Sequence, residues 1–151
     1  MTTTNGSLKA GELRLGNLVR WNPARAHPGT TLMPVLIEIS AIWRDKVGFS
    51  SPNFDHRVEP FEDDRMQMET RQKPLAELEA VPLEAALLQR AGFRPLEGER
   101  FVNDGFELVY DPAQSVFRYR RPDGVCLVVH YLHQLQNLYF SLTNEELDLA
   151  P

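Results

Sequence analysis

The fold is decided by residues 101–131, which read FVNDGFELVYDPAQSVFRYRRPDGVCLVVHY. Runs of β-branched and aromatic residues alternate here with three polar turns. The turns contain Asn-Asp-Gly at 103–105, Asp-Pro at 111–112 and Pro-Asp-Gly at 122–124, residue types that preset the backbone of a tight turn. Short strands joined by such turns predict an antiparallel meander. The predicted strands are Phe101–Val102, Phe106–Tyr110, Val116–Arg120 and Val125–Tyr131.

A helix is predicted on each side of this meander. Before it, apolar residues recur at helical spacing and Gly92 is placed to end the helix in a left-handed conformation. After Tyr131 the spacing of the apolar residues changes from every second residue, as in a strand, to about 3.6 residues, which predicts a closing helix. Thr143–Glu146 has the form of a capping box, which predicts either one further turn or a frayed tail. The apolar faces are Leu83, Leu87, Leu88 and Ala91 in the first helix, and Leu135, Leu138, Tyr139 and Leu142 in the second.

The first half of the chain predicts a small β module. A strand resumes after the Gly16-Asn17 turn, and residues 32–43 form the most β-like segment. Arg44-Asp45 then turns the chain into a hairpin with Lys46–Phe49, and Val58–Phe61 offers a further edge strand. Several short strands with little helix favour a barrel-like or meander arrangement.

The predicted fold class is therefore α+β: a small N-terminal β-barrel-like or meander module, then a helix, an antiparallel β-meander and a C-terminal helix. A chain of 151 residues is about one domain long. Because each half is small, we expect the halves to pack together or the protein to form a homo-oligomer. The expected organisation is a disordered leader at 1–10, the β module at 11–61, a linker at 62–82, and the helix, sheet and helix at 83–147.

Charge and cysteine content restrict the class of protein. The 16 Lys and Arg against 21 Asp and Glu give a net charge of −5, which argues against a general nucleic-acid binder. The single cysteine, Cys126, excludes an intrachain disulfide and fits a reducing compartment. The N-terminal residues lack a signal-peptide pattern, and no apolar run approaches the ~18 residues of a membrane helix. We expect a cytoplasmic protein without a membrane partner.

The densest basic cluster is the strand that contains Arg118, Tyr119 and Arg120. In a strand, Arg118 and Arg120 point to the same face. Guanidinium groups suit phosphate or carboxylate, and flanking aromatic rings can stack a base, so a nucleotide-like ligand is a candidate. The alternative is a solvated face on which the arginines pair with acids such as Glu107 and Asp111.

Two further sets of side chains are candidate ligand-binding residues. Trp21 and Trp43, each beside an arginine, end two predicted strands; they indicate either an interface or the edge of the core. Gln134 and Asn137 belong to an amide-rich helix that also carries Gln136. This helix predicts a polar network lining a pocket or a symmetric contact, or else plain surface.

His130 and His133 are the close histidine pair in the chain. A metal site would need a third ligand, such as Cys126, Asp123 or Glu107, and the spacing is weakly specific. The two rings need not converge, so we predict no metal and no cofactor, and we keep His133 among the candidate ligand-binding residues. Cys126 lies in an apolar strand, where a buried thiol is the usual outcome.

Three stretches span most of the chain: ELRLGNLV at 12–19, VPL at 81–83 leading to AGF at 91–93, and YLHQLQNLYF at 131–140 with LTNEEL at 142–147. Together they resemble a family of small proteins from bacteriophages and prophages of Bacteroidota. The resemblance implies a phage context and the cytoplasm of the host cell, where small accessory proteins bind and block host components. The proline-rich region at 23–34 is longer than the family pattern leads us to expect.

The expected function is that of a non-catalytic phage accessory protein. It would counter a host defence by sequestering a small anionic, nucleotide-like signalling ligand, or would block a host protein. No nucleophile elbow, phosphate loop, dinucleotide fingerprint or zinc-protease motif occurs in the sequence. One alternative is a small metal-dependent hydrolase or nuclease using His130, His133 and an aspartate. Another is a structural or DNA-associated accessory protein.

Overall fold

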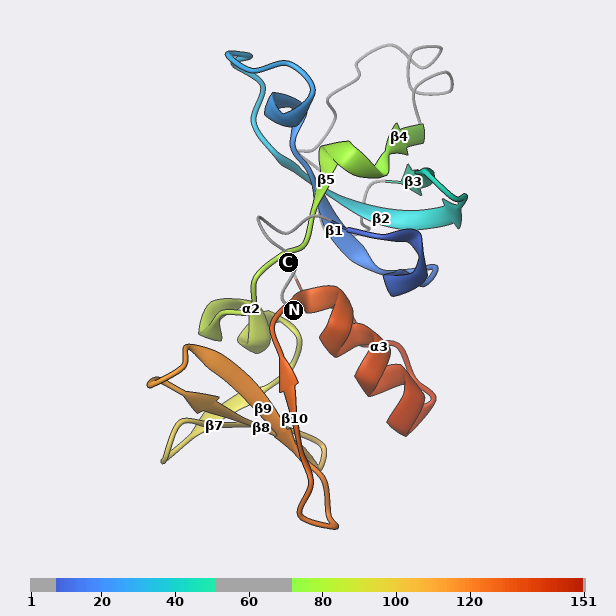
Figure 1. Cartoon of the computed structure of the whole chain (residues 1–151). Helices are drawn as coiled ribbons and strands as arrows, with labels where there is room; N and C mark the ends of the chain where they lie inside the picture. The colour runs from blue at the N-terminus through green and yellow to red at the C-terminus, as the bar shows by residue number, and fades with distance from the viewer. Residues whose placement is uncertain (1–7, 51–71, 151) are drawn as a thin grey trace. The chain divides into compact units, whose positions relative to one another are not determined.

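The computed structural model describes residues 8–50 and 72–150. This part of the chain contains two α-helices and ten strands (Figure 1). The strands form two antiparallel sheets, one of which curls into a half-barrel. The α+β class and the β-meander are thereby confirmed. The chain divides into two compact units, Met1–Val81 and Pro82–Pro151, each of which contains one sheet. No helix in the described part is long and apolar enough to cross a membrane.

The first unit has a five-stranded sheet in the order β4-β3-β2-β1-β5, with neighbouring strands antiparallel. Two alternate residues of β2, Ile37 and Ile39, are buried, as are Val19 and Val47 from the neighbouring strands. This alternation explains why one face of the sheet forms the core. The bounds are β1 Leu18–Trp21, β2 Val35–Ile42, β3 Lys46–Ser50, β4 Gln72–Pro74 and β5 Leu78–Glu79, with 3₁₀ turns η2 Ala10–Glu12, η3 Pro23–Arg25 and η4 Leu75–Glu77.

Parts of the predicted leader and linker belong to this folded unit. Leu8 is buried and η2 begins at Ala10, inside the predicted leader. Residues 51–71, which include the predicted strand Val58–Phe61 and most of the predicted linker, lie outside the described residues. The remaining linker residues differ from the prediction, because β4 pairs with β3 and β5 pairs with β1. Strands of two or three residues are too short to show alternation in sequence.

The second unit has a meander in the order β10-β9-β8-β7-β6. Asp104 and Gly105 both have positive φ, 48° and 88°, as required of the two-residue turn that joins β7 to β8. Gly124, with φ of 92°, occupies the turn predicted before the last strand. The bounds are α2 Ala85–Arg90, β6 Arg94–Leu96, β7 Arg100–Asn103, β8 Phe106–Asp111, β9 Val116–Arg120, β10 Cys126–Val129 and α3 Leu132–Thr143.

Aromatic side chains form the core of the second unit on one face of its sheet. Phe106 stacks on Tyr119 with 4.4 Å between ring centroids and contacts Tyr139 of α3 at 5.2 Å. Phe93, just beyond α2, meets the same Phe106 edge-on at 6.0 Å. The amide of Asn103 donates a hydrogen bond to the carbonyl of Ala91 at 3.1 Å. The sheet face that contains Phe106 is therefore the covered face of the second unit.

The buried face of α3 is rotated relative to the prediction. Leu132, Leu135, Gln136 and Tyr139 are buried, whereas Leu142 is 51% exposed. Gln136, which does not belong to the predicted apolar face, is only 2% exposed. The prediction of the buried face from apolar residues alone was therefore wrong, because it included the exposed Leu142 and left out the buried Gln136.

The chain beyond α3 neither continues the helix nor frays. Asn144 adopts the left-handed conformation (φ 60°) that ends a helix. Leu147 and Leu149 are then buried. The amide of Ala150 donates to the carbonyl of Arg90 at 2.7 Å, and Nε of Arg90 donates to the carbonyl of Ala150 at 2.9 Å. The tail is thus fixed at the end of α2.

Candidate functional site

The uncovered face of the second sheet carries arginines from three strands. Its register places Arg118 opposite Val109, and Val109 opposite Arg100, in one row across the sheet. Arg120 and Arg94 belong to the neighbouring row, which also contains Glu107. Paired residues project to the same face and alternate residues share it. The prediction that Arg118 and Arg120 share a face agrees with this register. We call Arg94, Arg100, Arg118 and Arg120 together the arginine face.

Two of these arginines are held by acids on the same face. Arg100 donates through Nε and Nη2 to both carboxylate oxygens of Glu107, at 3.2 and 3.1 Å. These hydrogen bonds lower the pKa of Glu107 below its ordinary value, and the charges of Arg100 and Arg120 act in the same direction. Arg118 donates to Asp111 at 3.3 Å and to Gln114 at 2.8 Å. Both arginines therefore have fixed orientations.

Arg94 and Arg120 are exposed and form no ion pair with any residue that the structure describes. Four arginines and two carboxylates share the arginine face, which leaves an excess of two positive charges. Residues 82–151 as a whole contain six arginines and ten acidic residues. Positive charge is thus concentrated on this face, within a unit that is acidic overall.

Tyr119 does not accompany its neighbouring arginines. It projects to the covered face, is buried, and stacks on Phe106. The alternation that brings Arg118 and Arg120 together sends the residue between them to the opposite side. A base therefore has no tyrosine on the arginine face against which to stack.

The candidate ligand-binding residues of α3 contact other parts of the same unit. The side-chain oxygen of Gln134 accepts the backbone N–H groups of His130 and Tyr131, at 2.9 and 3.1 Å, and so caps the start of the helix. His133 is buried, with its ring stacked on Tyr131 at 6.0 Å. Asn137 is half-buried one turn after His133. These residues do not converge with Arg118 and Arg120 on one face.

Cys126 is exposed, whereas the sequence predicted a buried thiol. The reason is its place in β10, which forms one edge of the sheet. Cys126 lies opposite Arg120 on the arginine face, and its neighbours Leu127 and Val128 are also exposed. Among the residues described, no three His, Cys, Asp or Glu side chains gather as a metal site would require.

Trp21 and Trp43 belong to the first unit and lie at opposite ends of β2. Trp21 pairs with Val35 at the first residue of that strand, and Trp43 follows its last residue. The strands β1 and β2 are neighbours, but antiparallel pairing separates the two tryptophans by the length of β2. Nε1 of Trp21 donates to Glu77 at 3.0 Å, and the ammonium of Lys73 lies 4.1 Å from the centre of the Trp21 ring. Burial lowers the pKa of Lys73, although Glu77 opposes this shift.

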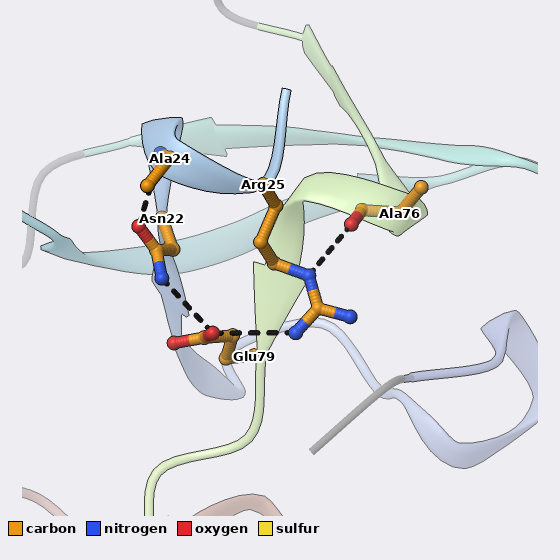
Figure 2. Close-up of polar contacts among 5 residues, drawn as sticks. All are labelled: Asn22, Ala24, Arg25, Ala76 and Glu79. Atoms are coloured by element: carbon orange, nitrogen blue, oxygen red, sulfur yellow. Dashed lines mark hydrogen bonds and ion pairs between the residues drawn. The ribbon is translucent and has the colours of Figure 1, made fainter. Parts of the chain in front are cut away.

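A second polar cluster of the first unit joins η3 to the η4–β5 segment (Figure 2). The carboxylate of Glu79 accepts from Asn22 at 3.0 Å and from Arg25 at 3.2 Å. Nε of Arg25 donates to the carbonyl of Ala76 at 2.9 Å. Asn22 in turn caps η3 by accepting from the amide of Ala24. We call Asn22, Arg25 and Glu79 the Arg25 cluster; its polar groups bind one another, which is typical of a structural role.

Sequence reasoning missed Arg94 and Arg100 as members of the arginine face. Arg100 could have been found, because counting back from the Asn-Asp-Gly turn places it opposite Val109 on the side of Arg118. Arg94 could not, because Pro95 interrupts the strand pattern of β6. No protein-family model, curated protein or solved structure matches this chain.

Proposed function

We propose that this protein is a non-catalytic binding protein that captures a small phosphate-bearing ligand on its arginine face. The observation that carries the proposal is the pair Arg94 and Arg120, which are exposed on the arginine face and form no ion pair or side-chain hydrogen bond with an acid among the described residues. A guanidinium group presents a planar fork of donors that matches phosphate oxygens. The other two arginines of the face are oriented by Glu107 and Asp111, whose charges they balance, so the excess positive charge comes from Arg94 and Arg120.

The spacing of the arginines favours a ligand with more than one phosphate. Arg118 and Arg120 are two residues apart on one strand, which separates their backbones by about 7 Å. Arg120 and Arg94 are three strands apart, a separation of about 14 Å. A single phosphate cannot bridge all of these groups, whereas a polyphosphate or a dinucleotide spans them.

Recognition on this face rests on phosphate and not on the base. Tyr119 is buried on the opposite side, and the residues between the arginines are valines, Glu107 and Cys126. None of them offers an aromatic plane to a nucleobase. In the phage context implied by the sequence resemblance, such a protein would sequester a host signalling nucleotide.

Titration calorimetry with a panel of nucleotides tests the proposal. The panel contains mono-, di- and triphosphates and cyclic dinucleotides, each with adenine and with guanine. We expect affinity to rise with phosphate number, to change little when the base is exchanged, and to fall as salt is added. Absence of heat for every member, or discrimination by base alone, contradicts the proposal.

A further inference from the structure

The second unit contains a cavity on its covered side, separate from the arginine face. Its volume is about 360 Å³. The rings of Phe101, Tyr110 and Phe117 line it from the sheet, and the segment 82–85 lines it from the start of α2. This volume lies within the range of small-molecule sites, about 300 to 1,000 Å³. The cavity therefore has room for a ligand of modest size.

The three aromatic rings meet at an angle and do not stack flat. Phe117 contacts Phe101 at 5.8 Å between centroids, with 68° between the ring planes. It contacts Tyr110 at 5.0 Å, with 51° between the planes. Rings inclined in this way form a corner of aromatic surface. Such surfaces attract cations through the negative charge density of the ring faces.

The charged residues that line the cavity are both acidic. Glu84 contributes from the segment before α2, and Glu99 from the loop between β6 and β7. The backbone of Glu99 is fixed, because its carbonyl accepts the N–H of Tyr110 at 2.8 Å. The start of α2 opposes a cation with a partial positive charge of at most about half a unit, which two carboxylates outweigh. The cavity thus combines an aromatic wall with net negative charge.

We propose that this cavity binds a small alkylammonium ion. The apolar groups on the nitrogen would contact Phe101 and Phe117, and the positive charge would be balanced by Glu84 and Glu99. An anion would be repelled by these carboxylates, and a neutral apolar molecule would gain nothing from them. The cavity lies on the opposite face of the sheet from the arginines and carries the opposite charge, so either proposal stands if the other fails.

The test is an NMR titration of the whole protein with choline. The matched probe is the neutral analogue of choline in which a quaternary carbon replaces the nitrogen, so that shape is kept and charge removed. We expect choline to shift the ring resonances of Phe101, Tyr110 and Phe117, and the neutral analogue to bind about tenfold more weakly. No shift of these rings at millimolar choline, or equal binding of both probes, overturns the proposal.

Substitutions of the carboxylates provide the second arm. Glu84→Gln with Glu99→Gln keeps the side-chain shape, and the side chain of Glu84 makes no capping hydrogen bond to α2 that would be lost. The double variant is expected to lower choline affinity about tenfold, on the scale of a partly desolvated charge contact. The control is Glu97→Gln, an exposed acid in the same loop as Glu99 but outside the cavity lining. If the control weakens choline binding as much as the double variant, the contacts are not those proposed.

Discussion

Arg25 in the first unit and Arg120 in the second show two uses of the same side chain. Arg25 donates to Glu79 and to the carbonyl of Ala76, and its side chain is 23% exposed. Arg120 is exposed, and the acid nearest to it in the sheet, Glu107, is already engaged in two hydrogen bonds from Arg100. The guanidinium donors of Arg25 bind groups within the fold, whereas those of Arg120 remain available for a ligand. The capacity of an arginine to bind a ligand therefore depends on how many of its hydrogen-bond donors have no partner within the protein, and not on its presence in a basic cluster.

The largest expected effect comes from removing the two unused arginines together. Arg94→Ala with Arg120→Ala should lower affinity for the best phosphate ligand about a hundredfold, because each removes a charged hydrogen bond worth about 1.5 kcal/mol. The melting temperature should stay within error of the parent protein, since neither side chain has an ion-pair partner among the described residues. Calorimetry and thermal denaturation measure the two quantities.

The control for this double variant is Arg44→Ala, an exposed arginine at the β2–β3 turn of the first unit. It removes the same kind of charge from a different sheet and should leave affinity nearly unchanged. Equal losses of affinity in the control and in the double variant would mean that only net charge matters. The contrast drawn between Arg25 and Arg120 would then be wrong.

The opposite result is expected in the Arg25 cluster. Glu79→Ala leaves the side chains of Asn22 and Arg25 without their shared acceptor, which should lower the free energy of unfolding by about 1–3 kcal/mol. Ligand affinity should not change. Chemical denaturation measures the loss, with the exposed Glu97→Ala as the matched control. A fully stable Glu79→Ala protein would show that this cluster does not hold the η4–β5 segment.

Trp21 and Trp43 provide a similar contrast within the first unit, between a side chain that has partners within the fold and one that is exposed. Trp21→Phe removes the Nε1 hydrogen bond to Glu77 while keeping a ring beneath Lys73, and should reduce stability by about 1 kcal/mol. Trp43→Phe, at an exposed position, should change stability by less than about 0.5 kcal/mol. Urea denaturation of both variants checks this order, and a reversed order contradicts the assigned roles.

The smallest expected effect concerns the pH dependence of the Arg100–Glu107 pair. The folded protein holds the pKa of Glu107 below the ordinary value of 4.5, so the pair stabilises the folded state above that pH. This stabilisation is lost as the pH falls through the lowered pKa. Because the pair is at the surface, where solvent screens the charges, its contribution to the free energy of unfolding should be small. Glu107→Gln should flatten this part of the stability curve; an unchanged slope would show that the pair is not formed in solution.

Sequence reasoning located the second sheet because its turns are chemically explicit. Asn103-Asp104-Gly105 and Pro122-Asp123-Gly124 each require backbone angles that few other residues adopt, so strand ends could be placed on both sides. It failed where strands are shorter than the alternation needed to recognise them, as in β4 and β5. The candidate site was found only in part. Side-chain alternation gave Arg118 and Arg120, but membership of Arg94 depends on pairing between strands, which no local pattern encodes.

The hydrogen bonds between Ala150 and Arg90 connect residues that are 60 positions apart in the sequence. The strands of the meander, in contrast, each pair with the preceding strand. Contacts between neighbouring segments form faster than contacts between distant ones, because bringing the ends of a long loop together costs more entropy. We therefore expect the contact between Arg90 and Ala150 to form after the meander when the second unit folds.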